Sequence, residues 1–160
     1  MRKIIPILLL TILTMVGCST LDCPLNNTVY TKYKLDGTVT ELTGCTMTVS
    51  TTKRDGEDSI LINKDENVDS FILPMSFANS ADTLYFEVQD RLERVFKDTV
   101  IVAKDNQPHF ESIDCSPSYF HTITGVKTTQ HLIDSIVINH KDVNFDATKT
   151  HFLIYFGTRD

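Results

Sequence analysis

Short segments of alternating apolar and polar residues dominate the chain from residue 28 onward. Leu84, Phe86 and Val88 occupy every second position of 83–88, which is the period of a strand with one buried face. Most other segments are rich in β-branched and aromatic residues, which favour strands, and no long helical period follows residue 18. The pattern predicts strands at 28–35, 45–52, 59–62, 70–74, 83–88, 92–96, 99–103, 132–138 and 151–156.

Turn-forming residues separate these segments at short intervals. Gly, Pro, Asn or Asp interrupt the pattern at 36–37, 43–44, 54–57, 78–80, 105–108 and 125. We therefore expect an all-β fold, an antiparallel β-sandwich of about eight or nine strands, in a single domain over 28–160. The segment 87–97 stays open between a short helix and a hairpin turn at Asp90-Arg91.

The beginning of the chain has the pattern of an export signal. A basic start precedes 13 mostly apolar residues, too few for a membrane span of about 20 residues. The sequence Thr14-Met15-Val16-Gly17-Cys18 resembles the lipobox of bacterial lipoproteins, in which a small residue precedes the Cys at the cleavage point. The resemblance implies a cleaved leader at 1–17, three acyl chains on Cys18, and a lipidated Cys and tether at 18–27. The alternative is an ordinary signal peptide with a chance Cys.

The charge balance narrows the range of partners. The chain has 160 residues with 15 basic and 21 acidic side chains. Removal of Arg2 and Lys3 with the leader leaves 13 basic against 21 acidic residues, a net charge of −8 with His neutral. This balance argues against nucleic acid and against polybasic contacts with lipid. We expect a non-catalytic cell-envelope protein that contacts the membrane through its lipid anchor and binds or assembles with another envelope protein. Ser19, where some inner-membrane lipoproteins carry Asp, favours the periplasmic face of the outer membrane.

Three cysteines remain once Cys18 is lipidated: Cys23, Cys45 and Cys115. An oxidising compartment favours a disulfide among them, and three pairings are possible. Cys45 lies on the apolar face of the predicted strand 45–52, as a buried apolar side chain would. Cys23 and Cys115 lie in turn-like segments that contain Pro, so we favour a disulfide between these two.

Two loops carry side-chain oxygens at alternate positions, which suits a hard cation such as Ca²⁺. The candidate ligands are Asp65, Asn67 and Asp69 in the first loop and Asp142, Asn144 and Asp146 in the second. Val68 stands where a calcium loop needs Gly, and Pro74 where it needs a bidentate Glu. The alternative is that these side chains bond their own backbone in turns. No other metal and no cofactor is predicted, because the five His residues are 9 to 12 residues apart.

The densest chemical neighbourhood is 108–121, which contains His, Glu, Ser, Cys and aromatic residues. We interpret it as loops that form a small-ligand or carbohydrate site, or more plainly as aromatic residues that close the end of the core. The candidates for ligand contact are His109, Tyr119, Phe120, His121 and Tyr155. A hydrolase or thiol enzyme would use a Ser/His pair or Cys115, but no nucleophile elbow accompanies them, so no enzyme activity is predicted. The absence of Trp weakens the carbohydrate interpretation.

A short pattern of Asp, hydroxyl residue and aliphatic residue occurs four times. It resembles the three-residue O-glycosylation signal on exported proteins of Bacteroidota-type bacteria. The candidate acceptors are Ser59, Thr83, Thr99 and Ser135. The alternative is that Asp-Ser and Asp-Thr begin strands well, because their side chains bond the preceding turn.

Several longer segments carry a family resemblance. Together with the lipobox, they are 21–30, 73–77, 108–125 and 133–139. In these segments the chain resembles an uncharacterised small-lipoprotein family of Bacteroidota-type bacteria, a domain of unknown function. The resemblance covers nearly the whole mature chain. It implies a compartment and a lineage, and it provides no activity and no catalytic residues to carry over.

Overall fold

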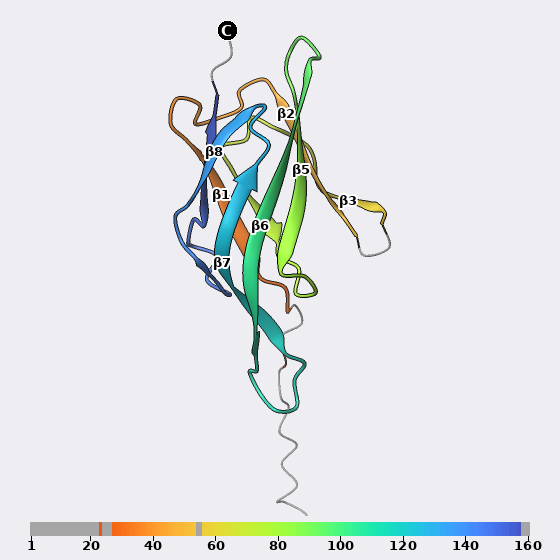
Figure 1. Cartoon of the computed structure of the whole chain (residues 1–160), viewed down its shortest axis with the longest axis vertical. Helices are drawn as coiled ribbons and strands as arrows, with labels where there is room; N and C mark the ends of the chain where they lie inside the picture. The colour runs from red at the N-terminus through yellow and green to blue at the C-terminus, as the bar shows by residue number, and fades with distance from the viewer. Residues whose placement is uncertain (1–22, 24–26, 54–55, 158–160) are drawn as a thin grey trace, which may run out of the picture.

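The computed structural model describes residue 23, residues 27–53 and residues 56–157. Within these residues the chain forms ten β-strands in two sheets (Figure 1). The all-β class and the sandwich-like architecture expected from the alternation are confirmed. The leader, the lipidation candidate Cys18 and most of the tether lie outside the described residues. The described part of the chain contains no helix that is long and apolar enough to cross a membrane.

The smaller sheet has four strands in the order β4-β1-β10-β8. They are β1 (Tyr30–Asp36), β4 (Ser70–Pro74), β8 (Ile133–Ile138) and β10 (Phe152–Phe156). β1 and β10 are parallel neighbours, with Tyr33 opposite Phe152, whereas the other two pairs are antiparallel. The antiparallel pairing expected from the sequence therefore holds for the other strand pairs and not for this one. No short turn joins β1 to β10, so hairpin geometry does not set their relative direction.

The larger sheet has six strands in the order β3-β2-β5-β6-β7-β9, all antiparallel. They are β2 (Thr46–Thr52), β3 (Asp58–Glu66), β5 (Ala81–Gln89), β6 (Val95–His109), β7 (Ser118–Thr128) and β9 (Asp142–Val143). β6 is 15 residues long. In Figure 1, β6 and β7 run down together to a hairpin at one end of the molecule, and the turn between β5 and β6 lies at the other end.

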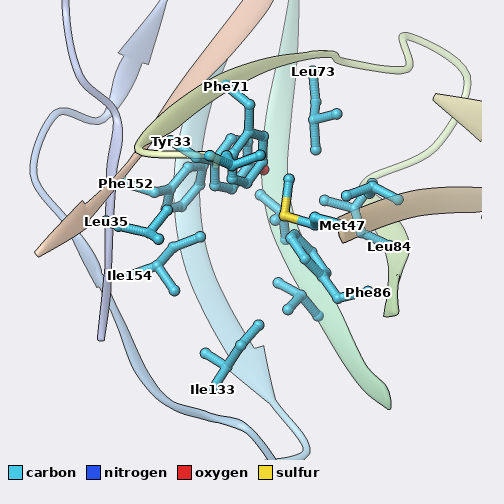
Figure 2. Close-up of a cluster of buried hydrophobic side chains, with 14 of the residues drawn as sticks. Tyr33, Leu35, Met47, Phe71, Leu73, Leu84, Phe86, Ile133, Phe152 and Ile154 are labelled. Atoms are coloured by element: carbon cyan, nitrogen blue, oxygen red, sulfur yellow. The ribbon is translucent and has the colours of Figure 1, made fainter. Parts of the chain in front are cut away.

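An aromatic stack fills the space between the two sheets. Tyr33 lies between Phe71 and Phe152, with ring centroids 5.0 and 4.7 Å away. Phe86 reaches the stack from the larger sheet, with its centroid 5.9 Å from that of Phe71. Figure 2 shows how Met47 lies beside Phe86, so that side chains of both sheets close the core. Burial raises the pKa of the Tyr33 hydroxyl far above its ordinary value.

The segment 87–97 forms a hairpin turn between β5 and β6. The Asp90 carboxylate accepts hydrogen bonds from the backbone N–H groups of Leu92 and Arg94, at 2.8 and 3.0 Å. These bonds satisfy the turn backbone, which a helix would satisfy internally. The separate strands predicted at 92–96 and 99–103 are wrong, because a single strand, β6, begins at Val95 and continues beyond both.

β7 was not predicted from the sequence, and turns were predicted inside two strands. The turn predicted at 105–108 belongs to β6, and the one predicted at Gly125 lies inside β7. The pairing register shifts next to this glycine, because Ala103 pairs with Gly125 while the following Lys104 pairs with Ile123. Gly125 therefore marks a β-bulge rather than a chain reversal.

Candidate functional site

The β6–β7 hairpin carries most of the residues predicted to contact a ligand. His109 pairs with Ser118 at the last rung of the ladder, so the connecting loop is 110–117. Tyr119, Phe120 and His121 lie on β7 and not in loops, which corrects the expected loop site. Their backbone groups pair with β6, so the sheet positions these residues up to the hairpin loop.

A disulfide joins the hairpin loop to the segment before the sandwich. Cys23 is bonded to Cys115, with the Cα atoms 5.5 Å apart and a sequence separation of 92. This is the pair favoured by the sequence analysis. Asn27 adds a hydrogen bond from its side-chain amide to the backbone carbonyl of Ser116, at 3.4 Å. Cys45 keeps a free thiol and packs against the core cluster.

The predicted ligand residues on the hairpin divide between the two faces of β7, because successive side chains of a strand point to opposite sides. On one face, Tyr119 stacks on Phe77 with a centroid distance of 5.1 Å. On the other face, His109 stacks on Phe120 at 4.2 Å, and Phe145 meets the edge of Phe120 at 5.2 Å. These residues form two separate aromatic contacts rather than one stacking site.

Tyr155 belongs to neither contact. It lies on β10 in the smaller sheet, and its hydroxyl donates a hydrogen bond to the Asp36 carboxylate at 2.9 Å. This bond lowers the pKa of Asp36 and raises the pKa of Tyr155. The ring also lies against Gly37, where an added Cβ would come within 2.8 Å of Tyr155 Cδ1. We therefore assign Tyr155 to the closure of the turn after β1.

A pocket of about 210 Å³ opens on the Tyr119 side of β7. Its lining is mostly apolar and includes Val29, Met75, Phe77, Pro117, Tyr119 and His121. His121 is 2% exposed. Asn27 and Thr28 complete the lining, and Asn27 Oδ1 is buried without a hydrogen-bond partner. The pocket therefore suits a small, mostly apolar molecule that carries a hydrogen-bond donor.

The hydrogen bonds around Asn106 fix the tautomer of His121. The Asn106 side-chain NH₂ group donates to the carbonyls of Phe77 and Asn79, at 3.1 and 2.9 Å. Its Oδ1 therefore faces His121 Nδ1, 2.7 Å away, as an acceptor. The neutral imidazole must donate from Nδ1, which leaves Nε2 as an unprotonated acceptor.

Burial holds this imidazole neutral. Desolvation, followed by the positive charge of Lys104, lowers the pKa of His121 to about 4. Lys104 is itself buried, and its Nζ lies 2.7 Å from Oδ2 of Asp82. The backbone N–H of Ser76 also donates to this Oδ2, at 3.2 Å. A charged pair inside the sandwich therefore stands next to the pocket histidine.

The side chains predicted as calcium ligands are used within the fold. Asn67 Oδ1 accepts a hydrogen bond from the Gly44 N–H at 2.9 Å, and Asn144 Oδ1 accepts one from the Asp146 N–H at 2.8 Å. Asp65 accepts from the Glu66 N–H at 3.1 Å. Within the described residues, no three His, Cys, Asp or Glu side chains are arranged to hold a metal ion. In the second loop Asn144 bonds the backbone of its own turn, whereas Asn67 of the first loop bonds the distant Gly44.

All four glycosylation candidates lie on strands and are half-buried: Ser59 on β3, Thr83 on β5, Thr99 on β6 and Ser135 on β8. The aspartates that precede these acceptors differ in burial. Asp82 forms the buried ion pair, and Asp98 is 4% exposed. Asp58 and Asp134 are exposed and lie on β3 and β8, the edge strands of the two sheets.

Asp98 ties β6 to the connection between β7 and β8. Its Oδ1 accepts from the Thr129 hydroxyl and the His131 N–H, at 2.6 and 2.8 Å. Its Oδ2 accepts from the Leu132 and Ile133 N–H groups, also at 2.6 and 2.8 Å. These four donors outweigh the cost of burial and lower the pKa of the Asp98 carboxyl.

Several site residues were not found from the sequence. Met75 and Phe77 line the pocket from the segment after β4. The positive charge of Lys104 contributes to the lowered pKa of His121. The signal for Lys104 was present, because Val100, Val102 and Lys104 share one face at every second position. The aromatic Phe77 carried no such signal, since its partner Tyr119 comes from a strand that was not predicted.

Comparison with known proteins identifies a family but no activity. Neither the curated proteins nor the solved structures include a match to this chain. Residues 46–156 match the family described as a family of unknown function (DUF6452). The matched region begins with β2 and ends with β10, and it spans more than half of the chain. The chain therefore belongs to the DUF6452 family of unknown function.

Proposed function

We propose that this chain is a non-catalytic, lipid-anchored protein of the cell envelope. Cys18 carries the anchor at the periplasmic face of the outer membrane, and the sandwich binds or assembles with another envelope protein. The export pattern that ends in Gly17-Cys18 supports the anchor. The disulfide supports an oxidising compartment, because such bonds persist outside the cytosol.

The observation that carries the proposal is the position of the Cys23–Cys115 bond. Five residue steps separate Cys18 from Cys23, which corresponds to at most about 18 Å of extended chain. The bond then joins this short tether to the β6–β7 hairpin loop. An anchor at Cys18 would therefore hold one end of the sandwich near the membrane and direct the β5–β6 turn away from it (Figure 1).

The outer face of the larger sheet offers a surface for a protein partner. Ile60, Tyr85 and Ile101 point outward there, with exposed fractions of 61%, 38% and 42%. The ladder places them close together, because Ser50 pairs with both Ile60 and Tyr85, and Thr83 pairs with Ile101. Exposed apolar residues grouped on one face are typical of interaction surfaces.

The geometry gives little support to the thiol-enzyme alternative. Its candidate nucleophile, Cys115, is bonded to Cys23 and has no thiolate to offer. Its candidate bases are also engaged: His121 Nδ1 contacts Asn106, and His109 Nε2 lies 3.3 Å from the Glu111 carboxylate.

Intact mass and non-reducing peptide mapping of the protein purified from its native membrane test the anchor. We expect a chain that begins at Cys18, carries acyl chains and contains the Cys23–Cys115 peptide pair. The Cys18→Ala variant should keep its leader and lack the acyl mass. A wild-type mass that equals the unmodified polypeptide would overturn the lipid anchor.

Crosslinking in intact cells tests the partner surface. We expect Ile101→Glu to abolish a crosslinked complex, because a buried charge costs far more than an exposed one. Ile72, on the outer face of the smaller sheet, is 54% exposed and serves as the matched control. An equal effect of Ile101→Glu and Ile72→Glu would argue against a specific partner on the larger sheet.

Capture of a small ligand is the second candidate function, and the pocket beside His121 favours it. The pocket pairs a mostly apolar lining with the acceptors His121 Nε2 and Asn27 Oδ1, which suits a compact molecule with a hydroxyl donor. This supports the small-ligand alternative over the carbohydrate one.

Phenol and toluene form a matched pair of probes for this pocket, because phenol carries a hydroxyl donor and toluene carries a methyl group in its place. Phenol should shift the NMR signals of His121 at concentrations where toluene does not; equal shifts, or none, would contradict this function.

A further inference from the structure

The loop of the β6–β7 hairpin exposes large apolar side chains at the end of the molecule. Ile113 is 97% exposed and Phe110 is 60% exposed. Two more aromatic residues stand beside the hairpin: Phe77, 64% exposed and stacked on Tyr119, and Phe145, 44% exposed and packed on Phe120. We define Phe77, Phe110, Ile113 and Phe145 as the apolar tip.

The covalent structure places the apolar tip near the proposed anchor. Ile113 is two residues from Cys115, and Cys115 is bonded to Cys23. Because Cys23 follows Cys18 by five residue steps, the hairpin loop stays within about 18 Å of a lipidated Cys18 plus the length of the disulfide. A bilayer is about 40 to 45 Å thick with its headgroup regions. This reach is only about half the thickness of the bilayer, so it is too short to hold the tip far from the membrane surface.

The charges of the loop indicate how it would meet a membrane. Glu111 and Asp114 are exposed and flank Ile113, and the loop 110–117 contains no Lys or Arg. Anionic headgroups would repel these carboxylates, so attraction by charge is excluded as the driving force. The remaining driving force is the transfer of the apolar side chains out of water. The two carboxylates limit the depth of insertion, so the loop would stay at the level of the lipid interface.

From these observations we propose that the apolar tip inserts into the lipid interface next to the anchor, with Phe110 and Ile113 as the inserted side chains. The inference rests on the proposed function, because it needs the acylated Cys18 to bring the tip to the membrane. It adds a second, non-covalent membrane contact to the anchor, so that two points rather than one hold the orientation of the sandwich.

Tryptophan fluorescence tests this contact directly, since the chain has no Trp and each substitution introduces a single reporter. The full-length acylated protein is reconstituted into phosphatidylcholine vesicles with or without bromine on the acyl chains. Phe110→Trp and Ile113→Trp should emit at shorter wavelength than in detergent-free water and lose most of their intensity in brominated vesicles. Leu92→Trp is the matched control, because Leu92 is 73% exposed in the β5–β6 turn at the opposite end of β6. Its emission should remain unquenched.

The outcomes separate the tip from the anchor. If mass spectrometry shows acylation and the protein floats with the vesicles, but the Phe110→Trp and Ile113→Trp variants emit without quenching, the tip inference fails and the anchor stands. Shorter-wavelength emission without quenching by bromine would mean that protein, such as a second copy, covers the tip, and this also overturns the inference. An unacylated chain would overturn both proposals. Replacing part of the phosphatidylcholine with an anionic lipid should not increase quenching; an increase would contradict the hydrophobic mechanism.

Discussion

Lys104 and Asp82 form an ion pair inside the sandwich, with the lysine Nζ 2.7 Å from Asp82 Oδ2 and the lysine side chain fully buried. The two residues come from neighbouring strands of the larger sheet. A buried charge is tolerated only when it is paired, because desolvation of a lone ion costs several kcal/mol. The pair therefore couples the inner face of β6 to the start of β5.

Removal of one partner of the ion pair should lower the free energy of unfolding much more than removal of both partners. We expect Asp82→Asn to lower the free energy of unfolding by about 3 to 5 kcal/mol, because it leaves Lys104 buried without a counter-charge. The double variant Asp82→Asn/Lys104→Met should recover most of this loss. Urea unfolding of Asp82→Asn, Lys104→Met and the double variant measures the coupling free energy between the two side chains.

A surface pair on the same two strands provides the control. Lys97 and Glu87 approach to 2.8 Å, but their side chains are 73% and 45% exposed. Lys97→Met should cost less than about 1 kcal/mol. If Asp82→Asn costs no more than this surface substitution, the buried pair is not a determinant of stability.

Substitution of Asp98 should destabilise the fold strongly, since its carboxylate accepts four hydrogen bonds. Asp98→Asn places an NH₂ group against N–H donors, so we expect a loss of about 3 kcal/mol or more in the free energy of unfolding. The matched variant Asp58→Asn, from the same three-residue pattern on an exposed strand, should cost less than about 0.5 kcal/mol. Thermal unfolding of both variants checks the difference, and equal losses would refute the role given to Asp98.

The sequence was sufficient for features that repeat along the chain. The alternation at Leu84, Phe86 and Val88 predicted β5, because inward and outward positions of a strand differ in polarity. The strand predicted at 70–74 coincides with β4. The turn-like surroundings of Cys23 and Cys115 indicated the disulfide, because loops bring Cβ atoms together more freely than paired strands do.

Features that depend on the register of strands distant in sequence could not be predicted. β7 was missed because Gly125 and the hydroxyl residues around it indicate a turn locally, whereas pairing with β6 holds them extended. The parallel pairing of β1 with β10 leaves no local mark in either strand. The pocket could not be predicted because β7 was missed, since Phe77 and Tyr119 meet only after β7 is placed beside β6.

The disulfide should stabilise the domain strongly because it closes a long loop. A separation of 92 residues corresponds to about 4 to 5 kcal/mol in the chain-entropy model. We expect Cys23→Ser/Cys115→Ser to lower the free energy of unfolding by about 2 to 5 kcal/mol. Cys45→Ser, which removes the free thiol, is the control for loss of a cysteine without loss of the bond. A similar midpoint for wild type in reducing and oxidising denaturant would contradict this prediction.

The glycan hypothesis makes a position-specific prediction. Asp82 and Asp98 have structural roles, so their presence before Thr83 and Thr99 is explained without a glycan. We expect any glycan at Ser59 and Ser135, on the two edge strands. Intact mass of the native protein should then exceed the acylated polypeptide by hexose-sized steps and decrease in the Ser59→Ala and Ser135→Ala variants. A mass without such a surplus would end the hypothesis.

The pocket histidine should make the fold sensitive to mild acid. The pKa of His121 is about 4 in the folded chain, below the ordinary value of 6.5. Between these two values the unfolded chain binds a proton that the folded chain excludes, so stability falls as the pH decreases from 6.5 towards 4. Protonation would also place a second positive charge beside Lys104.

The test compares the pH profile of stability for wild type and His121→Asn, whose amide can replace the Nδ1–H donor to Asn106. We expect the variant to lose about 1 to 2 kcal/mol less than wild type between about pH 7 and about pH 5. The pH dependence of stability that remains in the variant comes in part from His151, whose pKa is also lowered by burial and by His140. Parallel profiles for the wild type and the variant would show that His121 is not the acid-sensitive group, and His151→Asn would then be the next variant to measure.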